Sequence, residues 1–198
     1  MKPELVFKGT AFPESLRWHK GDLWFSDVLS GVVYRGDVTT GQLHKEVEIS
    51  PLVSGLGWLN SGELLVVDCE KRSVMRRDSK TGLSLHSDLS GHWGYNANDM
   101  LVDADNTVWV GTYGYNPESD APAPAELARI VNGKIDFPIG GLVFANGIAR
   151  IDADRIVVAE TFAVTFDLTV NMTAIPTTTA NSATATTHAK CCWGTTAS

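Results

Sequence analysis

Polar residues with oxygen ligands stand at the start of three apolar, strand-like runs. Glu14 precedes the first run, Asn98 and Asp99 precede another, and Asn146 precedes a third. Carboxylate and amide oxygens are hard ligands, which suit Ca²⁺, Mg²⁺ or Mn²⁺, whereas Zn²⁺ uses oxygen-only sites less often. A buried acid is costly alone but becomes favourable when it binds a cation. These positions predict a metal site if the fold brings them together.

The same residues also have purely structural interpretations. Asn146 begins an Asn-Gly pair, which is a common turn dipeptide, and Asn98 can cap a turn. Glu14 can be an exposed charge at a sheet edge. Asp27 and Asp68 stand at equivalent strand ends, where we expect them to bond turn amides within each repeat.

Nucleophilic catalysis is disfavoured by the local sequence. The serines lack the G-x-S-x-G context of a nucleophile elbow, and Cys69 has no evident histidine partner. A serine or cysteine hydrolase is therefore not expected.

The elements that would position the polar residues repeat along the chain. Residues 16–43 and 56–84 share one pattern: an apolar strand, a turn with Gly, a strand ending in Asp, a third strand and a Thr-Gly turn. Trp18 and Trp58 occupy the same place in the two units, 40 residues apart. A third unit starts near residue 100 and contains a Pro/Ala-rich insertion at 117–125, and a fourth starts near residue 147.

A period of about 40 to 50 residues with three or four short strands per unit is typical of β-propeller blades. Each blade is a small sheet whose faces are covered by its neighbours. A β-sandwich built of hairpins is the alternative, but sandwich strands need not repeat one motif. The predicted fold class is all-β, an incomplete propeller of about three and a half blades.

The chain changes character near residue 164. Residues 1–163 form the predicted partial propeller, and residues 164–198 form a Thr/Ala-rich tail with two charged residues, Asp167 and Lys190. Such a composition has too little apolar content for another blade and favours disorder. A frameshift or fusion would explain the change.

Composition excludes several classes of function. The net charge of −7 and the lack of a basic run argue against nucleic acid as the partner. No run approaches the roughly 20 apolar residues of a membrane span. Three cysteines without framework spacing and the lack of a secretory signal favour a cytoplasmic location.

Several motifs together resemble one family. These are FPESLRWHKGDLWFSDV, SGLGWLNSGELLVVDCEKRSVMRRD, NDMLVDADNTVWVGTYGY, GLVFANGIA and IVVAETFA, in chain order from about residue 4 to 163. They are similar to the senescence marker protein (regucalcin), gluconolactonase and luciferin-regenerating-enzyme family. The resemblance implies a six-bladed propeller with one divalent metal at its axis, Ca²⁺ foremost, and hydrolysis of a small sugar lactone or related lactone.

The resemblance also assigns site residues. It implies that Glu14 and Asn146 bind the metal and that Asn98 binds substrate. The family's second acidic ligand, an Asp that would serve as base, has no counterpart before residue 163, so the catalytic base is unassigned. Leu16 and Ala145 replace family prolines, and Asn96 stands where some members carry a substrate-binding Arg.

Three alternatives stay open alongside a lactonase impaired by truncation. One is a non-catalytic calcium- or ligand-binding propeller of the regucalcin type, the second is a protein-interaction propeller, and the third is an inactive gene fragment. The sequence leaves the physiological lactone and the oligomeric state undetermined.

Overall fold

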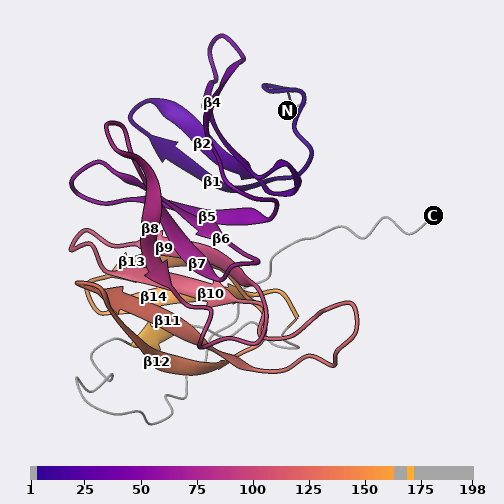
Figure 1. Cartoon of the computed structure of the whole chain (residues 1–198), viewed down its shortest axis with the longest axis vertical. Helices are drawn as coiled ribbons and strands as arrows, with labels where there is room; N and C mark the ends of the chain where they lie inside the picture. The colour runs from indigo at the N-terminus through magenta and orange to yellow at the C-terminus, as the bar shows by residue number, and fades with distance from the viewer. Residues whose placement is uncertain (1–3, 163–168, 172–198) are drawn as a thin grey trace.

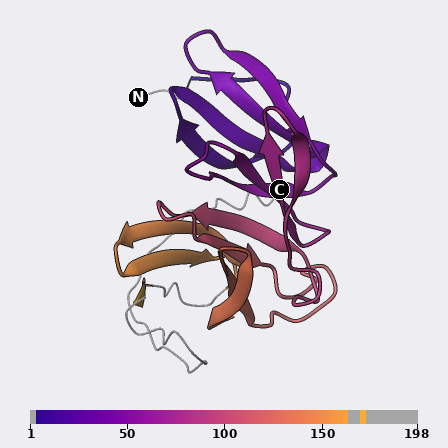
Figure 2. The same cartoon turned by 60° about the vertical axis from the view of Figure 1, so that its left-hand side comes forward.

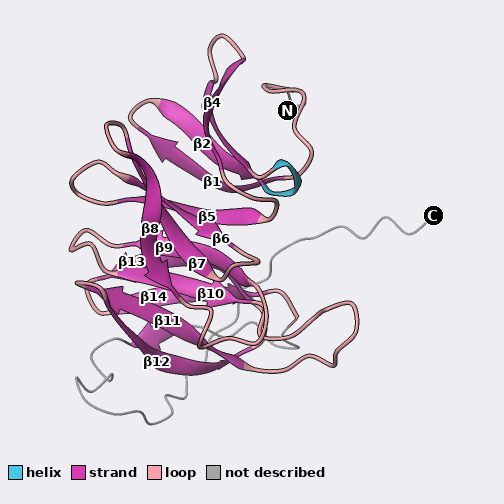
Figure 3. Cartoon of the chain, viewed as in Figure 1, coloured by secondary structure: helices cyan, strands magenta, loops and turns pink. Residues whose placement is uncertain are grey.

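The computed structural model describes residues 4–162 and the backbone of 169–171. In these residues the protein is all-β, and one short 3-10 turn, η1 (Val28–Ser30), is the helical element within them (Figure 3). The predicted fold class is confirmed. The predicted tail at 164–198 lies outside the described residues apart from a three-residue strand within it.

Four antiparallel sheets follow one another along the chain, and in each sheet neighbouring strands are consecutive in sequence. We call them blades 1 to 4. Blade 1 contains β1 (Pro13–His19), β2 (Asp22–Asp27), β3 (Val32–Asp37) and β4 (Gln42–Glu48). Blade 2 contains β5 (Val53–Trp58), β6 (Leu64–Asp68), β7 (Ser73–Asp78) and β8 (Gly82–Asp88). Blade 3 contains β9 (Ala97–Val102), β10 (Val108–Thr112), β11 (Ala125–Val131) and β12 (Lys134–Leu142). Blade 4 contains β13 (Ala145–Asp152), β14 (Arg155–Glu160) and β15 (Thr169–Asn171).

The repeat read from the sequence corresponds to turns with the same bonds. Asp37 ends β3, and its Oδ1 accepts hydrogen bonds from the amides of Thr39 and Thr40 at 2.8 and 3.3 Å. Asp78 ends β7, and its Oδ1 accepts hydrogen bonds from the amides of Lys80 and Thr81 at 2.7 and 2.8 Å. An Asp that bonds the amides just ahead of it is a standard way to fix a turn. The Asp and Thr-Gly pattern therefore sets the β3–β4 and β7–β8 hairpins.

The blades stack face to face, from blade 1 at the top of Figure 1 to blades 3 and 4 at the bottom, and Figure 2 separates the sheets from another side. The first strand of each blade lies against the first strand of the next, in the order β1, β5, β9, β13. Gly55 permits one close approach, because a Cβ there would lie 2.5 Å from the Met100 amide nitrogen.

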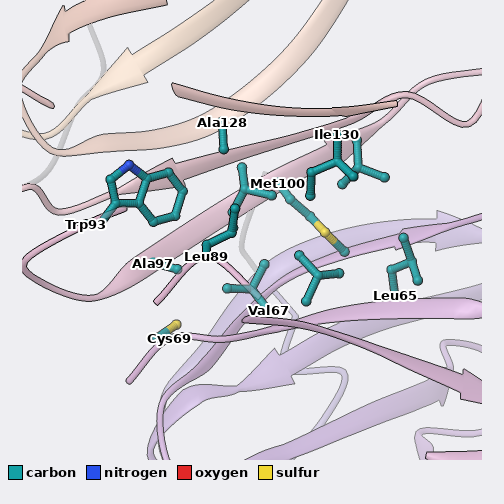
Figure 4. Packing of buried hydrophobic residues seen from close by; sticks show 12 residues of the cluster. Leu65, Val67, Cys69, Leu89, Trp93, Ala97, Met100, Ala128 and Ile130 are labelled. Carbon is teal, nitrogen blue, oxygen red and sulfur yellow. The ribbon is translucent and has the colours of Figure 1, made fainter. Parts of the chain in front are cut away.

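Apolar side chains fill the space between successive blades. The interface of blades 2 and 3 contains the largest cluster, in which Leu65, Met100 and Ile130 are almost fully buried (Figure 4). A second cluster around Trp24 and Leu56 joins blades 1 and 2. Because a four-stranded sheet cannot bury both faces alone, this packing is what holds the blades together.

No helix in the described part of the chain is long and apolar enough to cross a membrane.

Candidate functional site

The first strand of each blade is its inner strand, and each inner strand carries a β-bulge near its first residue. At each bulge, three residues span the distance that two residues span on the neighbouring strand. A bulge re-aims side chains, and bulges are common beside functional sites. The four bulges lie at the same end of adjacent strands, so they mark one candidate site. The register shifts occur between Glu14 and Arg17 in β1, Val53 and Leu56 in β5, Ala97 and Met100 in β9, and Ala145 and Ile148 in β13.

The pairing shows which residues are equivalent at this end of the blades. At the start of each inner strand, one residue pairs with the last or nearly last residue of the second strand. These pairs are Pro13 with Asp27, Val53 with Asp68, Ala97 with Thr112 and Ala145 with Glu160. The next residue along each inner strand is the bulge position, which is Glu14, Ser54, Asn98 or Asn146. All three sequence-predicted site residues therefore occupy the same structural position in different blades.

Glu14 is half-buried and shares its surroundings with a second carboxylate. Burial raises the pKa of Glu14, repulsion from Asp99 raises it further, and a hydrogen bond with Ser54 lowers it. The bulge that presents Glu14 includes Ser15 at φ +52°, a conformation that is uncommon outside glycine. The local backbone thus holds an acid close to another acid, which is favourable when a cation joins them.

Asp99 is buried and is bonded through one oxygen. Its Oδ1 accepts hydrogen bonds from Ser15 Oγ at 3.1 Å, from Arg17 Nη2 at 2.8 Å and from the Met100 amide at 2.8 Å. Arg17 also donates to the Met100 carbonyl at 3.0 Å. No described residue donates to Asp99 Oδ2, which leaves that oxygen available to a ligand or a water molecule.

The two asparagines are anchored through their amide nitrogens. Asn98 is buried, and its Nδ2 donates to the carbonyl of Ala145 at 2.9 Å, so it contacts the residue just before Asn146. Asn146 Nδ2 donates to Thr161 Oγ1 at 3.1 Å. Among the described residues neither side-chain oxygen accepts a hydrogen bond, so both remain available as ligands or acceptors.

The donor set fits an oxygen-preferring cation. Glu14 offers a carboxylate, Asn98 and Asn146 offer amide oxygens, and the repulsion between Glu14 and Asp99 is relieved by positive charge. Within the described ranges no three His, Cys, Asp or Glu side chains converge as a metal cluster. A cation here would therefore depend on amide oxygens and water as well as on carboxylates. The segment expected to supply the second acidic ligand, beyond residue 163, lies outside the described residues.

The strand-end acids are structural, as expected, although the amides that Asp27 bonds precede its repeat instead of lying in a turn within it. Asp27 accepts hydrogen bonds from the amides of Ala11 and Phe12, at 3.0 and 2.6 Å to its Oδ1. Asp68 accepts from the Ser50 hydroxyl at 2.8 Å and from the Lys71 amide at 3.2 Å. Both are buried and hold loops rather than ligands.

Three residues of the site were missed from the sequence. Ser54 could have been found by aligning the repeats, because it stands four residues before Trp58 as Glu14 stands four before Trp18. Arg17 is a cation within an apolar run, which is a weak signal, and its partner Asp99 comes from another blade. Ser15 gave no signal, since its contact with Asp99 depends on the bulge.

A stack of small antiparallel sheets, with polar bulges at one end of the inner strands, defines this protein as a β-propeller with a polar axial site. The sequence profile described as "SMP-30/Gluconolactonase/LRE-like region" matches residues 12–183. The chain belongs to this family, as the sequence motifs predicted. No curated protein sequence matches the chain.

Solved structures share the fold at low sequence identity. A calcium-binding protein, regucalcin, from Agrobacterium tumefaciens is 19% identical with a TM-score of 0.68, and the match covers 87% of this chain and 59% of that one. A gluconolactonase from Xanthomonas campestris is 18% identical with a TM-score of 0.66, over 82% and 59%. A luciferin-regenerating enzyme is 16% identical with a TM-score of 0.65, over 80% and 55%. The chain thus spans less than two thirds of the length of these structures.

Proposed function

We propose that the protein belongs to the lactone-hydrolysing members of its family and that the bulge positions form its metal-dependent active site. The observation that carries this proposal is the equivalence of Glu14, Asn98 and Asn146, which three different blades present at one end of adjacent strands. Family membership supports the reaction class that we propose, the hydrolysis of a cyclic ester. The similarity to a gluconolactonase supports the same class.

Glu14 and Asn146 would hold the cation, Ca²⁺ foremost, with Mg²⁺, Mn²⁺ or Zn²⁺ as alternatives. A divalent cation bound there supplies Lewis acidity to a lactone carbonyl. Glu14 suits this role because its negative charge is poorly solvated and is repelled by Asp99. The oxygen of Asn146 is available because the amide nitrogen is the end anchored to Thr161.

Asn98 and Asp99 would act on the substrate and the attacking water. Asn98 is fixed by its bond to Ala145, so its free oxygen can orient a substrate hydroxyl or a water molecule. Asp99 Oδ2 is the available carboxylate oxygen beside Glu14 and would accept a proton from water as it attacks the carbonyl carbon. Arg17 and Ser15 position this carboxylate by bonding its other oxygen.

Lactone hydrolysis by the purified 198-residue protein tests the proposal. With glucono-δ-lactone in a pH-stat, we expect slow turnover that requires Ca²⁺, stops with a chelator and falls at least about 100-fold in Glu14→Gln. Glu118→Gln, which changes an exposed acid in the β10–β11 loop, is the matched control. Turnover that is unaffected by chelator or by Glu14→Gln would contradict the proposal.

Calcium binding separates the enzyme from a non-catalytic binder. Ca²⁺ at 100 times its dissociation constant should raise the free energy of unfolding by about 2.7 kcal/mol, and this gain should disappear in Glu14→Gln. Stabilisation by calcium without turnover would favour the binding propeller. A melting temperature that neither calcium nor chelator changes would favour an interaction propeller without a metal.

A further inference from the structure

Five aromatic side chains gather on the loops at the bulge end of blades 3 and 4. Tyr113 stacks on Phe144, with ring centroids 4.0 Å apart and an interplanar angle of 20°. Phe162 meets Phe144 edge-on at 5.1 Å, and Tyr115 meets it edge-on at 6.2 Å. Tyr95 extends the group, 6.0 Å from Tyr113. We call these five residues the aromatic rim.

Hydrogen bonds connect the aromatic rim to the candidate site. The Tyr113 amide donates to the carbonyl of Asn96, two residues before Asn98, at 2.9 Å. The Thr161 amide donates to the carbonyl of Phe144 at 3.1 Å, and Thr161 Oγ1 holds Asn146. Burial raises the pKa of the Tyr113 hydroxyl, and the nearby Cys69 and Glu14 raise it further. The rim therefore adjoins the site.

Phe144 is held in an unusual backbone conformation at the centre of the rim. Its φ is +59°, although it is a bulky residue, and its side chain is almost completely buried. Such a conformation is strained in a bulky residue and persists where the surroundings fix it. Here the stacked Tyr113 ring and the Thr161 amide hold it in place. The rim is thus a fixed surface.

The segments that carry the rim and the two asparagines contain no charged side chain. Residues 89–98, 111–117, 137–149 and 161–162 include no Lys, Arg, Asp or Glu. Recognition of a polyhydroxylated sugar depends on several well-placed polar groups, because each buried hydroxyl needs a partner. Apart from the buried acids Asp99 and Glu160, which border these segments, this half of the site offers ring faces and neutral amides, which suit an apolar ligand surface with few polar atoms.

We infer that the aromatic rim selects lactones whose ring carries an aromatic or other apolar face, in preference to sugar lactones. The inference rests on the proposed function for its reaction class. The apolar part of the substrate packs on Tyr113 and Phe162, and the ester group points to Glu14 and Asn98. Phe162 is well suited to this contact because 48% of its surface is exposed.

Binding of unreactive lactams tests the inference without relying on turnover. The probe is 3,4-dihydroquinolin-2-one, the lactam counterpart of a benzo-fused δ-lactone, and the comparison ligands are δ-valerolactam and gluconolactam. With calcium present, isothermal titration should show the benzo-fused lactam binding at least about threefold more tightly than either comparison ligand. Equal or weaker binding of the benzo-fused lactam would overturn the inference.

Variants of the rim assign the contact to particular residues. Phe162→Ala and Tyr113→Leu should each weaken binding of the benzo-fused lactam about 3- to 10-fold and leave δ-valerolactam unchanged. Trp18→Ala is the matched control, because Trp18 is also an exposed aromatic residue but lies at the other end of β1. Phe162→Ala removes an exposed ring, so it keeps the test valid if Tyr113→Leu fails to fold. Unchanged binding in Phe162→Ala would overturn the inference.

Turnover of the matching benzo-fused lactone distinguishes this inference from the proposed function. Selective lactam binding without any hydrolysis contradicts the proposed function and leaves the role of the rim intact. Hydrolysis that favours glucono-δ-lactone over the benzo-fused lactone contradicts the inference and leaves the proposed function intact.

Discussion

The interface between blades 2 and 3 and the polar ends of the inner strands are built on the same strands but are stabilised differently. Met100 is fully buried among apolar neighbours in Figure 4, whereas Asp99, the residue before it, bonds Ser15 and Arg17 from blade 1. Burial of apolar surface stabilises the interface. Placing Glu14 in a half-buried position beside Asp99 opposes stability at neutral pH, because burial, and then repulsion from Asp99, raise the pKa of Glu14. The apolar interface therefore maintains the fold, whereas the polar end contributes less to stability and is the site that we propose for binding.

The largest effect should come from the apolar interface. Leu65→Ala removes a fully buried side chain between blades 2 and 3 and should lower the free energy of unfolding by about 2–5 kcal/mol. Urea denaturation followed by fluorescence measures the loss. Leu85→Ala, at an exposed position on β8, is the control and should change stability by less than about 0.5 kcal/mol. Similar losses in both variants would show that this interface is not a cooperative core.

A smaller loss should follow from breaking the ion pair at the polar end. Asp99→Asn keeps the shape but removes the charge that faces Arg17, and should cost about 1–3 kcal/mol. The double variant Arg17→Met/Asp99→Asn should recover part of the loss, because no unpaired cation remains. Asp99→Asn also removes the charge that repels Glu14. The same double-mutant cycle should therefore be repeated in a Glu14→Gln background, where this repulsion is absent. Additive losses would mean that the ion pair carries no coupling energy.

The smallest change should have the opposite sign. Because burial and Asp99 raise the pKa of Glu14 above its ordinary 4.5, the folded protein binds this proton more tightly than the unfolded chain does. The stabilisation is present below pH 4.5 and is lost as the pH rises through the raised pKa. Without calcium, Glu14→Gln should therefore be slightly more stable than wild type at pH 7, and should lose this part of the pH dependence.

Urea midpoints between pH 4 and pH 8 test this prediction, with Glu118→Gln as the control at an exposed acid. Parallel pH profiles for wild type and Glu14→Gln would contradict it. A large drop in stability at pH 7 would also contradict it, because Glu14 would then belong to the stabilising part of the molecule.

The fold could be predicted because the repeat depends on local chemistry. Asp37 and Asp78 fix equivalent turns by accepting hydrogen bonds from amides two and three residues ahead, so the turns can be predicted from the local sequence. The shared position of Glu14, Asn98 and Asn146 could be predicted for a similar reason, since each stands at the start of an apolar strand. Contacts between blades have no such local sequence pattern and could not be predicted. Arg17 reaches Asp99 across 82 residues of sequence, and only the stacking of the blades brings the two together.

The aromatic rim also escaped prediction from the sequence. Tyr113 follows β10 and Phe144 lies between β12 and β13, so the two rings that stack are 31 residues apart in the sequence. An aromatic residue in a loop has many structural explanations, so its position in the sequence alone does not indicate a ligand-binding role. Alignment of the repeats would have recovered Ser54, because the tryptophans fix the register.

The recurring bulge has a consequence for how such a protein can change. Because each of the four blades has a bulge at the same position, a single substitution can exchange the chemical group presented at the axis while the strands around it stay as they are. Ser54 is the natural place to try this, as its hydroxyl occupies the position that a carboxylate holds in blade 1. New ligand chemistry can thus be acquired one blade at a time, on a scaffold that does not need to be rebuilt.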